Sequence, residues 1–106
     1  MSKDIDAAFH WYSTAATNGS VRAKVNLGHM YELGLGTAKD TVHALQLYRE
    51  AADAGVPIAE TNVGQAYEFG MGTAPDLAEA LKWYERAAQH GDAIAQKRLK
   101  AKGLLP

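Results

Sequence analysis

A 36-residue repeat constrains the fold of this chain more than any other feature of its sequence. When the sequence is shifted by 36 places against itself, the same residue types recur without a gap. The most regular positions are Asp4, Asp40 and Asp76; Ala8, Ala44 and Ala80; Tyr12, Tyr48 and Tyr84; and Gly19, Gly55 and Gly91. Repeats of this length are typical of helical solenoids, in which each unit buries its apolar surface against its neighbours. We therefore divide the single domain of residues 1–106 into units at 4–39, 40–75 and 76–106, the last of which is incomplete.

Each unit is predicted to form two helices joined by a short turn. Asp40 and Asp76 lie where the cap of a first helix is expected, because aspartate accepts hydrogen bonds from free backbone N–H groups. That helix is expected to end at Gly55 or Gly91, since glycine adopts the left-handed conformation at no steric cost. Pro57 then falls in the first turn of a second helix, where its missing N–H is harmless. No run alternates apolar and polar residues, so no strands are predicted.

The first helix of each unit carries an apolar stripe at helical spacing, and we expect this stripe to be buried. In the first unit it comprises Ile5, Ala8, Trp11, Tyr12, Ala15, Ala16 and Gly19, and in the third unit Leu77, Ala80, Trp83, Tyr84, Ala87 and Ala88. The paired alanines allow two helix backbones to approach closely while aromatic rings fill the adjoining space. Recurrence with the repeat favours core packing of these rings over an aromatic binding platform.

The repeat resembles the Sel1-like repeat family, a relative of the tetratricopeptide repeat. The matching positions are Ala8, Trp11, Tyr12, Ala15, Ala16, Gly19, Ala23, Leu27, Gly28, Tyr31, Gly34, Gly36 and Asp40. In the family the Trp11 position holds Trp or Leu, and the second unit has Leu47 there. The second unit otherwise keeps this pattern apart from Val63 in place of the leucine, and the third unit departs from it at Lys100. The resemblance implies an all-α, right-handed α-solenoid of about three helix-turn-helix repeats. It also implies a non-enzymatic adaptor or scaffold for other proteins. Several secreted members carry a cysteine pair in each repeat, whereas this chain has no cysteine.

Composition excludes several classes of protein. The chain is 47% hydrophobic and 22% charged, which suits one folded domain with a modest core. Its net charge of −1 lacks the field that draws proteins to nucleic acids or anionic membranes. The longest uncharged run, residues 7–21, is shorter than the roughly 20 apolar residues of a membrane span. Acidic residues at positions 4 and 6 interrupt the place of a signal peptide's apolar stretch, so a cytoplasmic location is expected.

One local basic cluster is compatible with nucleic-acid or membrane contact, but a simpler explanation is available. The cluster consists of Lys97, Arg98, Lys100 and Lys102. It lacks interleaved aromatic residues, and cations are favoured near a helix C-terminus by the helix dipole. We therefore expect no nucleic-acid partner.

No constellation of residues predicts catalysis, a cofactor or a metal. The four histidines occupy four different repeat positions without an i,i+4 pair, whereas a zinc site needs three or four convergent ligands. No nucleophile, base and orienting group recur at productive spacing. The Gly-x-Gly-Thr segments at 34–37 and 70–73 lie between helices, so they are predicted to be turns rather than phosphate-binding loops. The chain is therefore expected not to be an enzyme.

The face opposite the apolar stripe differs from unit to unit and is the predicted partner-binding surface. Its residues are His10, Thr14, Gln46, Arg49, Glu50, Asp53, Lys82, Glu85, Arg86 and Gln89. In a solenoid the first helices line up, so these side chains would form a ladder. Residues 40–75 hold one base and five acids (−4), and residues 76–106 hold six bases and four acids (+2). This polarity favours an oriented protein or peptide partner. The alternative is that this face is only solvated surface.

The sequence leaves alternatives for the role of the apolar ends of the solenoid and for the function of the chain. Apolar surface near Phe9, Leu104 and Leu105 is expected to cover the uncapped ends, mediate self-association or continue into a longer array. One alternative function is an immunity or inhibitor protein for a cognate toxin. The other is a hydrolase of small or cell-wall-related substrates, which the absence of a catalytic constellation disfavours.

Overall fold

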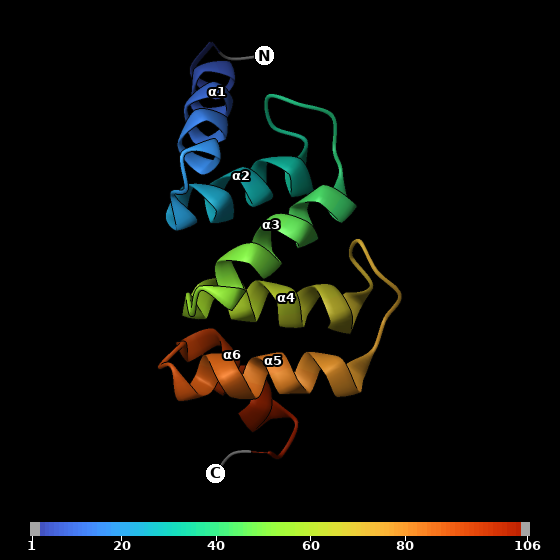
Figure 1. Ribbon diagram of the computed structural model, residues 1–106. Helices are drawn as coiled ribbons and strands as arrows, with labels where there is room; N and C mark the ends of the chain where they lie inside the picture. The colour runs from blue at the N-terminus through green and yellow to red at the C-terminus, as the bar shows by residue number, and fades with distance from the viewer. Residues whose placement is uncertain (1–2, 105–106) are drawn as a thin grey trace.

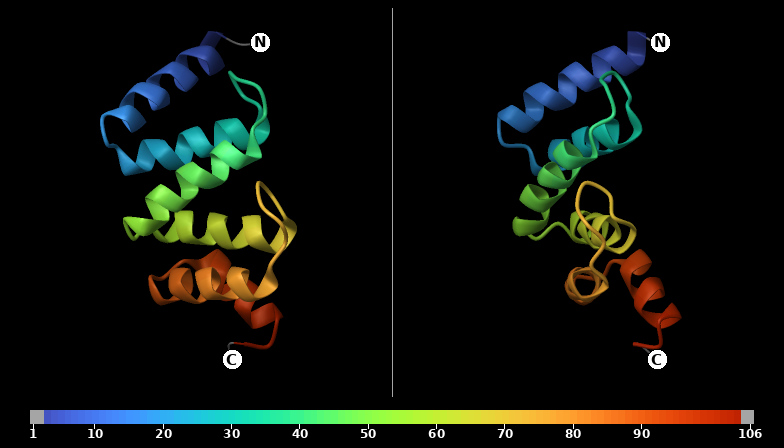
Figure 2. Two further views of the ribbon diagram at one scale, coloured as in Figure 1. Left: turned by 45° about the vertical axis from the view of Figure 1, so that its right-hand side comes forward. Right: turned by 90° about the vertical axis from the view of Figure 1, so that its right-hand side faces the viewer.

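A computed structural model describes residues 3–104, which form six helices and no strand. The helices are α1 (Lys3–Thr17), α2 (Val21–Leu33), α3 (Thr41–Asp53), α4 (Pro57–Phe69), α5 (Leu77–Gln89) and α6 (Ala93–Ala101). They stack in chain order into an elongated body of 45 × 23 × 19 Å, with α1 and α6 at opposite ends (Figure 1). The main contacts are between helices that follow one another in the chain, and two further views show the same order of layers (Figure 2). The predicted all-α solenoid is confirmed.

The predicted helix boundaries are confirmed by their capping contacts. The Asp40 and Asp76 carboxylates accept hydrogen bonds from the backbone N–H three residues further on, at 3.0 and 3.1 Å. Gly55 and Gly91 follow the ends of α3 and α5 with φ angles of 85° and 92°. Pro57 begins α4. The local sequence signals thus fix where the first helices start and stop.

The two Gly-x-Gly segments are structural turns that lie against the first helix of their own unit. The first glycine of each ends the preceding helix in the left-handed conformation. The second glycines, Gly36 and Gly72, have φ angles of 73° and 78° and approach neighbouring atoms closely. A Cβ added to Gly36 would lie 2.8 Å from the Phe9 Cβ, and one added to Gly72 would collide with the Thr41 carbonyl. Both positions therefore require glycine for conformation and for space.

The expected burial of the apolar stripe is correct for most of α3 and α5 and wrong for α1. Seven of its residues in the second and third units are at most 2% exposed: Ala44, Tyr48, Ala51, Ala52, Ala80, Tyr84 and Ala87. By contrast, α1 has no buried residue, and Trp11 is 75% exposed. Leu77 is also 52% exposed, and Ala88 is half-buried. The difference arises because no described helix covers the outer side of α1.

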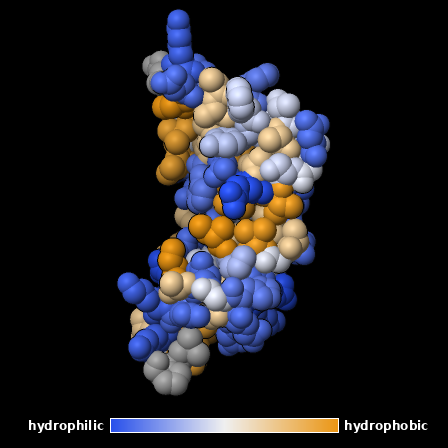
Figure 3. All heavy atoms as spheres, turned by 90° about the vertical axis from the view of Figure 1, so that its left-hand side faces the viewer, coloured by the Kyte–Doolittle hydropathy of each residue, from blue (hydrophilic) through white to orange (hydrophobic). Residues whose placement is uncertain are grey.

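The ends of the stack differ from the expectation that apolar residues cover them. The Phe9 ring packs edge-on against Tyr31 of its own unit, with ring centroids 5.6 Å apart. Leu104 is 49% exposed, and Leu105 lies outside the described residues. On the edge seen in Figure 3, the largest group of apolar side chains lies at mid-height of the stack. None of the described helices is long and apolar enough to cross a membrane.

Candidate interaction surface

Contacts between a tyrosine and a glycine join successive units and position the first helices. Gly28 of α2 faces the Tyr48 ring, and Gly64 of α4 faces the Tyr84 ring. A Cβ added to Gly28 would lie 2.6 Å from Tyr48 Cε1, and one added to Gly64 would lie 2.7 Å from Tyr84 Cδ1. Each ring therefore lies directly on the backbone of the preceding helix. We call these two contacts the tyrosine sockets.

Each socket also contains a carboxylate one helical turn beyond its glycine. The Tyr48 hydroxyl donates to Glu32 Oε1 at 2.9 Å, and the Tyr84 hydroxyl donates to Glu68 Oε1 at 2.6 Å. Arg98 and Lys102 of the following unit also contact Glu68, at 3.4 and 2.9 Å. Sequence reasoning missed these contacts, although glycine and glutamate recur four residues apart in both helices.

The sockets shift the pKa values of their groups in opposite directions. Burial, together with the adjacent Glu32 or Glu68 carboxylate, raises the pKa of Tyr48 and Tyr84 well above the usual value of 10.0. Burial opposes ionisation of Glu68, but hydrogen bonds from Tyr84 and Lys102 and the charges of Lys102 and Arg98 outweigh it. The pKa of Glu68 is therefore lowered.

These shifts predict how stability depends on pH. The folded state holds the Tyr48 and Tyr84 protons more tightly than the unfolded chain does. The contribution of these two hydroxyls to the free energy of unfolding is therefore complete below about pH 10 and is lost at higher pH. The Glu68 contribution is present above the ordinary glutamate pKa and is lost as the pH falls through its lowered value. Denaturant titrations across the pH range measure both losses.

A double variant isolates the alkaline loss from the titration of lysines. We expect Tyr48→Phe with Tyr84→Phe to flatten the decline in unfolding free energy above about pH 10. An unchanged decline in this variant would contradict the role assigned to the two hydroxyls.

The predicted partner-binding residues of α3 are exposed and surround one open hollow. The hollow has a volume of about 530 Å³ and lies between α3 and the Gly-x-Gly turn that follows α4. It is lined by Val42, Leu45, Gln46, Arg49, Glu50, Asp53, Gly72 and Thr73. The Glu50 carboxylate is held by an ion pair with Lys24 of α2 at 3.2 Å. Because the buried stripe faces the neighbouring helices, the polar side of α3 is left to solvent.

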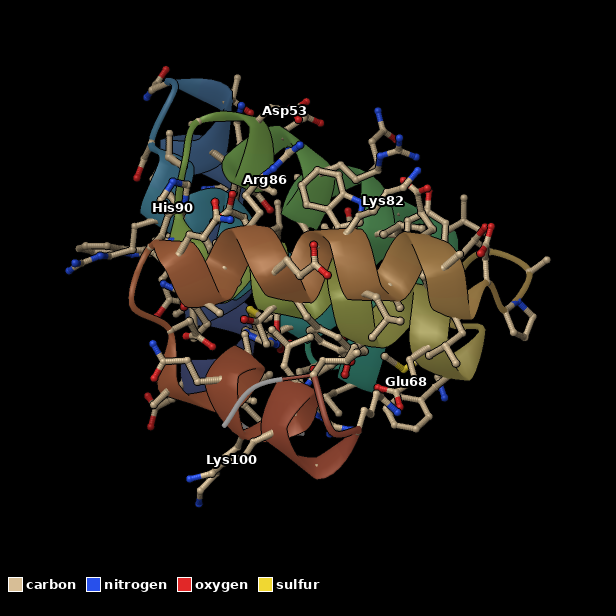
Figure 4. All side chains as sticks on the ribbon, turned by 90° about the horizontal axis from the view of Figure 1, so that it is seen from below. Asp53, Glu68, Lys82, Arg86, His90 and Lys100 are labelled. Atoms are coloured by element: carbon tan, nitrogen blue, oxygen red, sulfur yellow. The ribbon has the colours of Figure 1, made fainter. Side chains whose placement is uncertain are left out.

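Two of the predicted partner-binding residues on α5, Lys82 and Arg86, lie on the same side of the molecule as the end of α3. Figure 4 shows Asp53, Arg86 and Lys82 on this side, and Glu68 and Lys100 on the opposite side. The Arg86 guanidinium lies over the Trp83 ring, 4.6 Å from its centroid. Because Trp83 is buried, its ring fixes the position of an exposed cation. We define the α3–α5 surface as Gln46, Arg49, Glu50, Asp53, Lys82 and Arg86.

The other four predicted residues lie in two separate hollows. His10 and Thr14 line one on α1, where the Thr14 hydroxyl donates to the His10 carbonyl at 3.0 Å. Glu85 and Gln89 line a hollow of about 700 Å³ between α5 and α6. The structure thus gathers the predicted residues of α3 with two of α5, and it places the remainder apart.

Three of the four histidines, His29, His43 and His90, contact another helix of the stack. His90 Nδ1 lies 2.6 Å from the buried Glu60 Oε1, and His29 Nδ1 lies 2.8 Å from the Tyr48 hydroxyl. The His43 ring stacks on Tyr31. Among residues 3–104, no group of three or more histidine, aspartate or glutamate side chains converges in a way that would hold a metal ion.

Comparison with known proteins identifies the family. The family model for the Sel1 repeat matches residues 1–20, 21–56 and 57–92. The chain belongs to the Sel1 repeat family. The family model places the repeat boundaries differently from the units defined above. Each of its complete repeats contains the second helix of one unit and the first helix of the next, namely α2 with α3 and α4 with α5. The match to 1–20 contains α1 alone.

Solved structures of other Sel1 repeat proteins share the fold. A Sel1 repeat protein from Oxalobacter formigenes is 42% identical with a TM-score of 0.82, and the alignment covers 87% of this chain and 69% of that one. A protective antigen present in uropathogenic Escherichia coli strains that displays an SLR fold is 34% identical with a TM-score of 0.80. That alignment covers 86% of this chain and 20% of the antigen.

A third structure, cysteine-rich protein B of Helicobacter pylori, is 27% identical with a TM-score of 0.80. The alignment covers 86% of this chain and 68% of that protein. This chain forms the same fold without any cysteine. No curated protein sequence matches it significantly.

Proposed function

We propose that this chain is a non-enzymatic protein-interaction module that binds a protein or peptide on its α3–α5 surface. Sel1 repeat proteins are generally scaffolds for protein interaction, which supports the class of function. The observation that carries the choice of surface is the position of Arg86 over the buried Trp83 ring. Arginine is enriched among residues that dominate binding energy, and a cation already held in place loses less conformational freedom on binding.

The charges of this surface favour a partner that binds in one orientation. Glu50 and Asp53 on α3 face solvent near the hollow, whereas α5 contributes Lys82 and Arg86. A partner with a basic group opposite α3 and an acidic group opposite α5 would be complementary. Such complementarity fixes orientation and accelerates association more than it adds affinity.

Three single substitutions test this surface. Arg49→Ala, Glu50→Ala and Arg86→Ala are each expected to weaken binding of the partner, with Arg86→Ala costing about 2 kcal/mol. The melting temperature is expected to stay nearly unchanged, because exposed charges contribute little to stability. The partner is obtained by affinity capture from the native source with mass spectrometric identification. Binding isotherms at two salt concentrations are then measured beside thermal melts.

Arg22→Ala is the matched control, because Arg22 is an exposed arginine on α2 outside the α3–α5 surface. Its binding isotherm is expected to equal that of the parent. If the three surface variants also bind like the parent at both salt concentrations, the α3–α5 surface is only solvated. Capture of one toxin in a tight stoichiometric complex would instead favour the immunity or inhibitor alternative.

A further inference from the structure

The hollow beside α3 follows one side of this helix from its first turn to its last residue. We call it the α3 hollow. Its α3 residues recur every three or four positions, so they form one stripe along the helix: Val42, Leu45, Gln46, Arg49, Glu50 and Asp53. This stripe is about 16 Å long, given the rise of an α-helix. Because α3 packs on α2 before it and on α4 after it, the α3 hollow lies within the stack and not at one of its ends.

One end of the α3 hollow carries an apolar side chain that the repeat does not explain. Val42 lies in the first turn of α3 and is 67% exposed. Its counterparts in the other units are Asp6 and Ala78, so no contact of the repeat requires a large apolar residue at this position. Leu45, one turn further on, also lines the hollow but is buried. An aliphatic side chain placed on Val42 would therefore remove apolar surface from water.

The opposite end of the α3 hollow carries an unpaired carboxylate. Asp53 is the last residue of α3 and is exposed. Among residues 3–104 it has no ion-pair partner, whereas the Glu50 carboxylate one turn earlier is held by Lys24. The C-terminal end of a helix already carries partial negative charge. Because the counterparts of Asp53 are the uncharged Thr17 and Gln89, this acid is a feature of the second unit alone, and it favours a basic group.

The middle of the α3 hollow offers hydrogen-bonding groups that suit an extended chain. The Gln46 amide and the Arg49 guanidinium are exposed, and neither bonds to another side chain or to the backbone in the described part of the chain. The amide can donate and accept hydrogen bonds, and the guanidinium can donate them. An extended segment leaves its backbone N–H and C=O groups unpaired, whereas a helix pairs them internally. These two side chains therefore favour an extended segment over a helix.

We propose that the α3 hollow binds an extended segment of a partner protein in which an aliphatic residue and a lysine or arginine lie four positions apart. Such residues point to the same side of an extended chain and are about 13 Å apart. The aliphatic side chain packs on Val42, and the long basic side chain reaches Asp53. Gln46 and Arg49 bind the backbone between them. This inference rests on the proposed function, because the α3 hollow shares four residues with the α3–α5 surface.

An array of immobilised seven-residue peptides tests the spacing. Each peptide carries one leucine and one arginine among serine and glycine residues, in either order and separated by two, three, four or five positions. We expect the complete chain to be retained most strongly when the separation is four. The best peptide is then titrated in solution while the methyl signals of Val42 are followed by NMR, and a saturable shift is expected.

Three variants test the two ends of the α3 hollow. Val42→Ala and Asp53→Gln introduce residues that the third unit carries at the same positions, Ala78 and Gln89, so the fold is expected to persist. Val42→Ala is expected to weaken peptide binding about fivefold, because it removes part of the apolar contact. Asp53→Gln is expected to weaken it about threefold and to reduce its salt dependence. Asp53→Lys is expected to prefer a peptide with glutamate in place of the arginine, an exchange of preference that unfolding cannot produce.

Arg86→Ala is the matched control, because Arg86 belongs to the α3–α5 surface but does not line the α3 hollow. Peptide binding is expected to be unchanged in this variant, whereas binding of the natural partner is expected to fall. Equal retention of all peptides, or a Val42 signal that does not move, would overturn the inference and leave the proposed function to its own test. Unchanged binding of the natural partner by Arg86→Ala would instead count against the α3–α5 surface and not against the peptide site.

Two other occupants of the α3 hollow are distinguished by further measurements. The parent chain and Val42→Ala are both expected to sediment as monomers. A parent dimer that Val42→Ala converts to a monomer would assign the hollow to a second copy of the chain and overturn the inference. Stronger binding of a cross-linked helical peptide, with leucine and arginine about eleven positions apart to match the stripe, would overturn it in favour of a helix.

Discussion

Gly64→Leu is expected to lower the free energy of unfolding by about 3 kcal/mol, because it places a side chain where the Tyr84 ring lies. A Cβ alone would come within 2.7 Å of Tyr84 Cδ1. The ring has little room to move away, since it is fully buried and its hydroxyl is bound to Glu68 at 2.6 Å. On an exposed helix, replacing glycine would instead stabilise by up to about 1 kcal/mol. Urea denaturation followed by circular dichroism measures the difference.

Lys100→Leu provides the matched control, because residue 100 is the counterpart of Gly64 on α6 and is exposed. Its effect is expected to stay within about 0.5 kcal/mol. The same substitution is thus expected to destabilise the chain at position 64, where the Tyr84 ring rests on the helix, and to have little effect at the exposed position 100. Equal denaturation midpoints for Gly64→Leu and the parent would show that the socket yields without cost.

Local sequence signals were sufficient to predict the helices and their ends. Asp40 and Asp76 accept the predicted capping bonds, and Gly55 and Gly91 adopt the predicted left-handed conformation. These features depend on a few consecutive residues, so they can be inferred without knowing the tertiary structure. The repeat period then indicates how each unit meets the next.

Burial of α1 was predicted wrongly because periodicity does not reveal whether a neighbour is present. Trp11 and Trp83 occupy the same repeat position, yet among residues 3–104 only Trp83 packs against a preceding unit. The sockets were missed for a related reason. A glycine inside a helix usually lowers helix stability, so its value at Gly28 and Gly64 becomes apparent only when the ring that rests on it is located.

The exposure of the predicted binding residues could be inferred from the sequence, but their grouping in space could not. All ten predicted side chains belong to exposed residues. Their arrangement depends on how successive helices cross in the stack, and the helical spacing of apolar residues in the sequence does not specify these crossing angles. Residues of α3 consequently share a hollow with a turn that follows α4, while His10 and Thr14 lie in a separate hollow on α1.

Trp83→Ala is expected to destabilise the chain by about 3 to 5 kcal/mol, whereas Trp11→Ala changes its stability by no more than about 0.5 kcal/mol. The two tryptophans are counterparts in the repeat, but Trp83 is 8% exposed and Trp11 is 75% exposed. Removing the Trp83 ring leaves a cavity in the cluster that joins α3, α4 and α5, and it also removes the support of Arg86. Removing the Trp11 ring mainly takes apolar surface out of water.

Thermal melts and urea titrations of the two variants measure this difference directly. The comparison holds the residue type and the repeat position constant, so the two variants differ in how deeply the removed ring is buried. If Trp11→Ala destabilises the chain as much as Trp83→Ala, then Trp11 is already covered in solution by another part of the molecule or by another copy.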